Sequence, residues 1–206
     1  VVPILLLIVI NTLAHALPLL AVALLKAILP FGWARRVCNP VVTGFAENWI
    51  AVNSAMIDGM TRTRFDVSEG AELRQDGHYL VLANHQSGVD ILVLQKIFNR
   101  RIPFLRFFLK RQLIWVPVLG LCWWALDFPF MGRYSHRQVA KHPELGKRDM
   151  EATRRACEKF RAVPVAIMNF VEGTRFTPEK HASQSSPYRR LLKPKSGGVA
   201  FVIDAM

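Results

Sequence analysis

The chain has 206 residues, enough for one domain with a sizeable hydrophobic core, and 51% of them are hydrophobic. Its formal net charge of +12 lies entirely in residues 81–206, which favours an anionic membrane surface or anionic substrates as partners. No nucleic-acid-binding motif accompanies this charge, and the three scattered cysteines indicate neither a disulfide framework nor a zinc site.

Residues 1–30 are almost entirely apolar and long enough to cross a bilayer. The run is interrupted at Asn11, His15, Pro18 and Lys26. A kinked or re-entrant helix pair and a buried core helix are therefore alternatives to a membrane span. Arg35 and Arg36 follow this run directly, which predicts that its carboxyl-terminal end faces the cytoplasm. Residues 41–60 predict an amphipathic helix, so we expect a membrane anchor with linker helices over residues 1–60.

From residue 64 onward, short apolar runs alternate with helical segments. We predict neighbouring strands at residues 64–67 and 79–83, a helix at 89–98 and a strand at 102–109. The apolar stretch 112–131 carries three tryptophans, and its prolines and glycine argue against a simple span. It is either a monotopic element with tryptophans at headgroup depth or part of the core.

The remaining pattern predicts a helix at residues 149–161 and a strand at 163–171. The predicted helix has apolar residues on one side and arginines and lysines largely on the opposite side. Pro164 begins the predicted strand. Strands that alternate with helices indicate an α/β fold, mostly a central β-sheet flanked by helices. We therefore expect one folded body over residues 61–206.

Polar residues follow the strand at 79–83 in the run Asn84-His85-Gln86-Ser87-Gly88-Val89-Asp90. His85 is expected on the turn before the next helix, where the loop can bring it back toward Asp90 in the first helical turn. A carboxylate that binds one ring nitrogen fixes the tautomer and leaves the other nitrogen free as a base. The alternatives are a helix cap for Asp90 and a structural role for His85.

A second polar run, Glu172-Gly173-Thr174-Arg175, follows the strand at 163–171. Ligand sites of α/β sheets lie at the carboxyl ends of strands. Glycine permits close approach of the backbone, threonine supplies a hydroxyl, and arginine offers a planar fork for phosphate. The pairing of this run with N-H-x-x-x-x-D, each behind its own strand, predicts one composite site.

With these two runs, residues 60–206 resemble the glycerophospholipid acyltransferases of the lysophosphatidic acid acyltransferase (PlsC) type. A further block corresponds to Lys110, Pro117, Gly120 and 130–133, and the run E-G-T-R-F-T-P-E-K-H looks most like YihG-type bacterial members. Gly132 stands where many members carry an acid. The family's fourth block is absent before Met206, so the resemblance implies that the carboxyl-terminal part of the catalytic domain is missing.

The resemblance implies a membrane-bound transferase that moves a fatty acyl group from acyl-CoA or acyl carrier protein to 1-acyl-glycerol-3-phosphate, giving phosphatidic acid. His85 and Asp90 would be catalytic. The implied substrate-binding residues are Lys110, Arg133, Glu172, Gly173, Thr174 and Arg175. Arginines would hold the acceptor phosphate, Glu172 would orient an arginine or the glycerol, and amides near Gly88 or Gly173 would stabilise the oxyanion. No metal or cofactor is implied.

Two alternatives are an acyltransferase for another lysophospholipid and a non-catalytic basic protein with the same fold that binds membranes. The expected partners are a phospholipid surface, a lysophospholipid acceptor and a thioester donor, without nucleic acid. The implied location is the inner (cytoplasmic) membrane, with the active site facing the cytoplasm.

Overall fold

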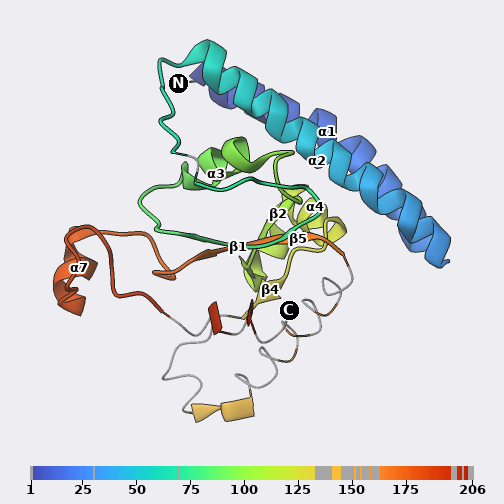
Figure 1. Ribbon diagram of the computed structural model, residues 1–206. Helices are drawn as coiled ribbons and strands as arrows, with labels where there is room; N and C mark the ends of the chain where they lie inside the picture. Colours follow the sequence, from blue (N-terminus) through green and yellow to red (C-terminus); the bar gives the residue numbers. More distant parts are fainter. Residues whose placement is uncertain are drawn as a thin grey trace.

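The computed structural model describes residues 2–29, 31–68, 70–132, 141–144, 163–195, 199–200 and 202–203, with the single residues 151, 154 and 158. Its elements follow the order of a helical hairpin and then an α/β body (Figure 1). Most of the helix predicted at residues 149–161 lies outside the described residues.

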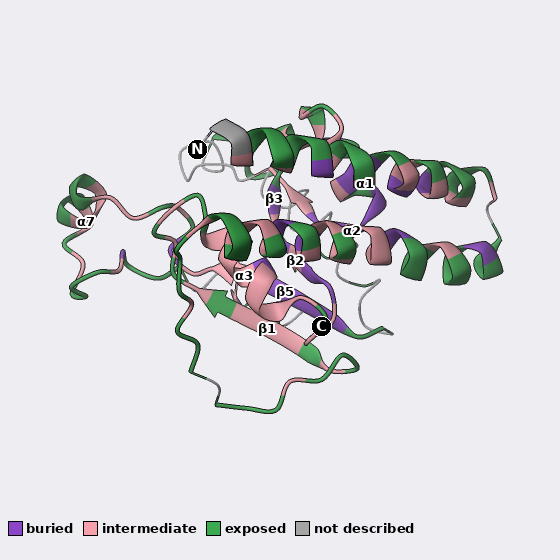
Figure 2. Ribbon diagram, turned by 90° about the horizontal axis from the view of Figure 1, so that it is seen from above, coloured by how far each residue is buried: buried purple, intermediate pink, exposed green. Residues whose placement is uncertain are grey.

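Two long helices, α1 (Val2–Ile28) and α2 (Gly32–Met60), pack side by side as a hairpin (Figures 1 and 2). Buried alanines on both helices let the backbones approach closely, at Ala16, Ala23 and Ala46. The Asn11 side chain donates to Asn53 Oδ1 at 2.9 Å, which adds a buried polar contact. The helix α1 is continuous through Pro18, so this segment is one helix and not the re-entrant pair that was an alternative.

Residues Ile4–Ile28 of α1 have a mean hydropathy of 2.3 and are long enough to cross a membrane. Among the described residues, no other helix meets both conditions. Most large apolar side chains of α1 are exposed, including Leu6, Ile10, Leu17, Leu24 and Ile28. This helix is therefore a possible membrane anchor.

The central sheet has three parallel strands in the order β1-β5-β2. These are β1 (His78–Ala83), β5 (Val165–Phe170) and β2 (Leu105–Phe107). The middle strand β5 is buried on both faces from Val165 to Met168, which explains its continuous apolar sequence. Figure 2 shows this buried strand between its two neighbours.

The prediction of a strand at residues 64–67 is wrong, because these residues form no strand. In the described part of the chain, β1 is the edge strand of the sheet, and residues 64–67 do not pair with its open side. Phe65 instead lies beneath Lys96 Nζ, 5.1 Å from the ring centroid, against α3 (Asp90–Phe98).

The strand predicted at residues 102–109 is divided between β2 and β3 (Leu109–Lys110), and β3 pairs in parallel with β4 (Phe130–Met131). Between β3 and β4 lie the 3-10 helix η1 (Arg111–Trp115) and α4 (Leu119–Ala125). Trp115 and Trp124 are exposed, whereas Cys122 and Ala125 are buried. Part of this stretch thus belongs to the core, and the monotopic element with tryptophans at headgroup depth stays a prediction.

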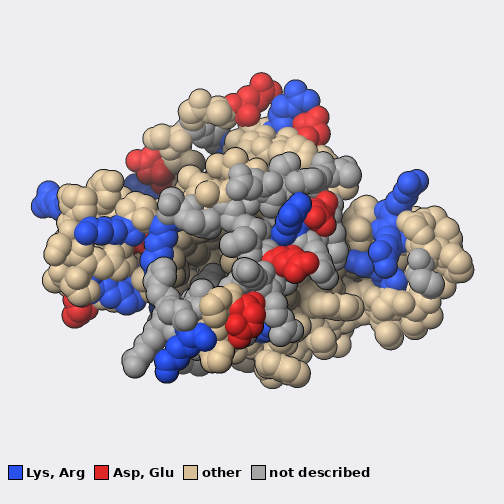
Figure 3. Space-filling view, turned by 90° about the horizontal axis from the view of Figure 1, so that it is seen from below, with Lys and Arg blue, Asp and Glu red and all other residues tan. Residues whose placement is uncertain are grey.

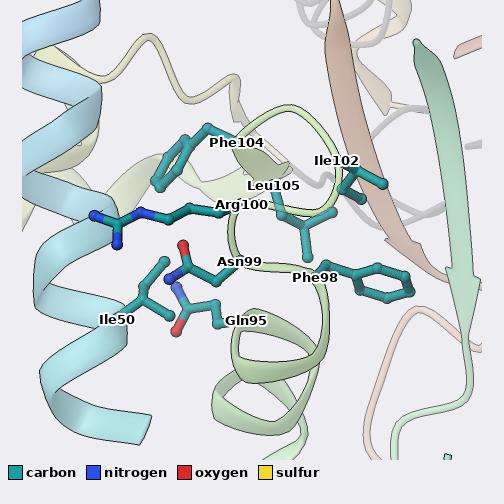
Figure 4. Close-up of a pocket in the computed structure, with 8 residues that line it drawn as sticks. All are labelled: Ile50, Gln95, Phe98, Asn99, Arg100, Ile102, Phe104 and Leu105. Carbon is teal, nitrogen blue, oxygen red and sulfur yellow. The ribbon is translucent and has the colours of Figure 1, made fainter. Parts of the chain in front are cut away.

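The hairpin and the body share one hydrophobic core, because α2 packs on α3 and α1 packs on α4. A small cavity of about 10 Å³ lies where α3 ends near α2. Figure 4 shows the residues that line it, with the Arg100 side chain extended toward α2. Asn99 Nδ2 donates to the Glu47 carbonyl at 3.1 Å, and Arg100 Nε lies 3.6 Å from Glu47 Oε2. These polar contacts fix α3, which carries Asp90, against the hairpin.

Candidate active site

The two polar runs meet at the carboxyl edge of the sheet. Strands β1 and β5 are parallel and in register, with Ala83 opposite Phe170, so the chain leaves both strands at the same level. The Val171 amide then donates to the Ala83 carbonyl at 3.1 Å. This register brings together residues that lie some eighty positions apart in the sequence.

The His85 imidazole and the Asp90 carboxylate form a direct pair, with Nδ1 2.8 Å from Oδ2. Asp90 begins α3, and its Oδ2 also accepts the backbone amides of Gln86 at 2.7 Å and Ser87 at 2.9 Å. Burial alone would raise the pKa of Asp90, but the hydrogen bonds from His85, Ser87 and Gln86 outweigh it and lower that pKa. An ionised Asp90 thus accepts the Nδ1 proton, which leaves Nε2 as the basic nitrogen.

Two further contacts fix the His85 ring and backbone. The ring stacks on Phe170, the last residue of β5, with centroids 3.9 Å apart and planes inclined by 12°. The His85 carbonyl accepts the Phe176 amide at 2.7 Å. Both partners flank the second polar run, so the segment from β5 onward holds His85 from two sides.

Glu172 is completely buried, and each of its carboxylate oxygens accepts a backbone amide. Oε1 accepts the N–H of His85 at 3.0 Å, and Oε2 accepts the N–H of Leu192 at 2.9 Å. The carboxylate therefore connects the loop after β1 to the segment that returns from α7 (Pro178–Gln184). Direct contact with a substrate, which the resemblance implies for Glu172, would require these covered oxygens to become exposed.

Gly173 and Arg175 bring the second run against the first. Gly173 has φ +68°, a conformation that glycine adopts without strain, and its amide donates to the Phe170 carbonyl at 2.9 Å. A Cβ on Gly88 would lie 3.9 Å from one terminal nitrogen of Arg175. The exposed Arg175 guanidinium thus lies beside the turn between His85 and Asp90, where a substrate anion could reach it.

Lys180 is a site residue that the sequence did not single out. Its Nζ donates to Thr174 Oγ1 at 2.8 Å and to the Arg175 carbonyl at 3.0 Å. Thr177 caps the helix α7 by accepting the Lys180 amide, and Pro178 occupies its first turn. The motif T-P-E-K could have revealed this cap, but not the return of the lysine to the preceding loop.

The other cations that the sequence indicated lie at different places around the site. Lys110 in β3 is exposed and lies just beyond the carboxyl end of β2, at the same edge of the sheet as His85. Arg133 lies outside the described residues. The Lys195 stem passes Gly173, since a Cβ there would be 3.3 Å from Lys195 Cδ, and its amide donates to the Val171 carbonyl at 2.7 Å.

Comparison with known proteins agrees with the acyltransferase family that the sequence motifs of the body indicated. The family model described as Acyltransferase matches residues 64–206. The chain is 29% identical over 136 residues to the 1-acyl-sn-glycerol-3-phosphate acyltransferase 3 of Arabidopsis thaliana, covering 63% of this chain and 33% of that protein. It is 28% identical over 143 residues to an uncharacterized acyltransferase of Schizosaccharomyces pombe, covering 68% and 45%.

The fold is similar to the crystal structure of the 1-acyl-sn-glycerophosphate (LPA) acyltransferase, PlsC, from Thermotoga maritima. The TM-score is 0.54 at 17% identity, and the match covers 96% of this chain and 69% of that one.

By contrast, the match to the Arabidopsis and Schizosaccharomyces proteins covers less than half the length of either relative.

Proposed function

Because the chain belongs to the acyltransferase family, we propose that it transfers a fatty acyl group from acyl-CoA or acyl carrier protein to the free hydroxyl of 1-acyl-glycerol-3-phosphate, giving phosphatidic acid. The observation that carries this proposal is the His85–Asp90 pair at 2.8 Å with the Arg175 guanidinium beside Gly88. The run E-G-T-R-F-T-P-E-K-H supports a YihG-like member.

In the proposed reaction, His85 Nε2 takes the proton of the acceptor hydroxyl as that oxygen attacks the thioester carbonyl carbon. The carbon–sulfur bond of the tetrahedral intermediate then breaks, and the imidazolium returns the proton to the leaving thiolate. The ionised Asp90 stabilises the imidazolium in between. No acyl-enzyme forms, so no serine or cysteine nucleophile is required beside His85.

Developing charge on the carbonyl oxygen needs a hydrogen-bond donor. The Gly173 amide already donates to Phe170, so the Gly88 amide is the better candidate of the two that the sequence suggested. Arg175 would hold the acceptor phosphate, with Lys110 and Arg133 as proposed partners, and Thr174 would shape this subsite. Glu172 would act by holding the His85 backbone.

The proposed place of action is the cytoplasmic face of the inner membrane. The apolar helix α1 and the exposed Trp115 and Trp124 support membrane association, since tryptophan is enriched at headgroup depth. Both substrates are amphiphilic, so a site beside the membrane surface would receive them without full transfer into water.

The test is a thiol-release assay in membranes that contain the wild type or His85→Ala, with acyl-CoA or acyl carrier protein as donor. We expect release that depends on lysophosphatidic acid and is lost in the variant. Competing lysophospholipids would reveal a different acceptor. Membrane binding without release from the wild type, with either donor, would contradict the proposal and favour a non-catalytic protein that binds membranes.

A further inference from the structure

A second, larger cavity of about 900 Å³ lies between the hairpin and the body. It is lined by the last turns of α1, the first half of α2, the end of α4 and the residues just before β5. Its volume is at the upper end of the range for small-molecule sites, about 300–1,000 Å³. The cavity can therefore accept a ligand much larger than a single ion.

This cavity is separate from the candidate active site. Val163 and Pro164 line it, immediately before the first residue of β5, whereas His85 lies beyond the last residue of the paired strand β1. The six residues of β5 span about 20 Å at roughly 3.3 Å per residue. A ligand in the cavity would thus lie at the opposite edge of the sheet from the catalytic pair.

Among the described residues of the cavity lining, three cations, Lys26, Arg35 and Arg106, accompany two carboxylates, Glu47 and Asp127. Lys26 Nζ lies 3.6 Å from Asp127 Oδ2, and Glu47 lies 3.6 Å from Arg100 outside the cavity. The Arg106 guanidinium donates to the Leu126 carbonyl at 2.9 Å and is also attracted by Asp127. Burial lowers the pKa of Arg106 to about 10, so this side chain is charged at neutral pH. The described lining residues, three cations and two carboxylates, thus carry a net charge of +1, which a bound anion would stabilise.

Apolar side chains surround these charges. The lining includes Trp124, which is 56% exposed, and Val163, which is 48% exposed, beside the end of α1 with its exposed leucines. Figure 3 shows Lys and Arg side chains gathered at the end of the hairpin, with uncharged residues around them. A ligand with an anionic head and an apolar tail matches both parts.

We propose that this cavity binds an anionic phospholipid of the membrane as a resident ligand that is not consumed in the reaction. Arg35 and Lys26 contact the headgroup phosphate, and an acyl chain lies along Trp124 and Val163 toward the exposed face of α1. The site would fix the hairpin to the body in a membrane that contains anionic lipid. This proposal does not depend on the acyltransferase activity.

The test is native mass spectrometry of the full chain in a neutral detergent, titrated with phosphatidylglycerol or with phosphatidylcholine. We expect one phosphatidylglycerol to be retained in preference to phosphatidylcholine. Arg35→Gln should weaken that retention about tenfold, as expected for the loss of one charge-assisted hydrogen bond. Arg36→Gln is the matched control, because it removes the same charge from an exposed residue outside the cavity lining.

A second variant tests the cavity without altering charge. Ala27 lines the cavity and is exposed, so Ala27→Phe should occupy part of the volume and reduce lipid retention. Equal losses in Arg35→Gln and Arg36→Gln, or no preference for phosphatidylglycerol, would overturn the proposal. Complete displacement of the lipid by millimolar inorganic phosphate would also overturn it, since the site would then recognise free phosphate.

Discussion

Glu172 and His85 are joined by a hydrogen bond across 87 residues of sequence, in which the buried carboxylate accepts the His85 backbone N–H at 3.0 Å. The other oxygen of the same carboxylate holds the Leu192 amide. One side chain therefore fixes both the loop that carries the proposed base and the segment that closes behind it. The position of His85 thus depends on a residue that is itself inaccessible to solvent.

Glu172→Gln should lower both stability and turnover. A glutamine amide can accept only one of the two backbone N–H groups and turns its NH₂ toward the other, which costs about 1–3 kcal/mol for an unsatisfied buried donor. We expect kcat to fall more than tenfold, with a smaller change in KM for the acceptor, because Arg175 is retained. Thermal unfolding and steady-state kinetics of the same preparation measure both effects.

The control for that variant is Glu72→Gln in the segment before β1, which removes an equal charge from an exposed position. Its kcat and melting temperature should match those of the wild type. A normal kcat in Glu172→Gln would show that the bond to the His85 backbone is not needed for catalysis.

Asp90→Asn should lower turnover by orders of magnitude while the chain still folds. The substitution removes the negative charge that accepts the His85 Nδ1 proton and stabilises the imidazolium. Asp76→Asn is a matched control, because Asp76 is exposed and its partner is Arg74, away from the site. The thiol-release rate measures the effect, and unchanged release in Asp90→Asn would reduce Asp90 to a helix cap.

The Asp90 carboxylate should also stabilise the fold in a manner that depends on pH. Its folded-state pKa lies below the ordinary value of 3.8, so its contribution is fully present above the unfolded-state pKa. That contribution is lost as the pH falls through the lower, folded-state pKa. The stability difference between the wild type and Asp90→Asn should therefore narrow in the acid range where the Asp90 carboxylate is protonated. Denaturant unfolding between about pH 5 and pH 2 measures it, and a difference that stays constant over that range would contradict the assignment.

Lys180 should act as a positioning residue for the proposed phosphate subsite. Lys180→Met removes the donor that holds Thr174 Oγ1 and the Arg175 carbonyl, so Arg175 would lose its fixed position. We expect KM for lysophosphatidic acid to rise about tenfold, with little change in kcat, since one charged donor is lost. Lys180→Arg should restore part of the affinity.

Lys193→Met is the matched control for this change, because Lys193 is exposed and the substitution removes the same charge from a nearby segment. Equal increases of KM in Lys180→Met and Lys193→Met would indicate general attraction of the anionic acceptor. A fall in kcat alone would place Lys180 in another role.

Local sequence patterns were enough to predict the α/β class, the apolar amino-terminal helix and the two polar runs behind strands. These features depend on local periodicity and on turn residues such as Ser87 and Gly88, which act over a few positions. It also predicted that His85 would turn back to Asp90, because a five-residue spacing at a strand–helix turn leaves few other conformations.

How these parts are joined follows from contacts between distant segments of the folded chain. The order β1-β5-β2 places the Phe170 ring on His85, and the returning segment places the Leu192 amide on Glu172. The same packing places Phe65 against Lys96 of α3 and not in the sheet, and it sets α1 and α4 around a large cavity. These contacts connect residues that are distant in the sequence, and long-range packing and backbone hydrogen bonds fix them without any repeating pattern in the chain.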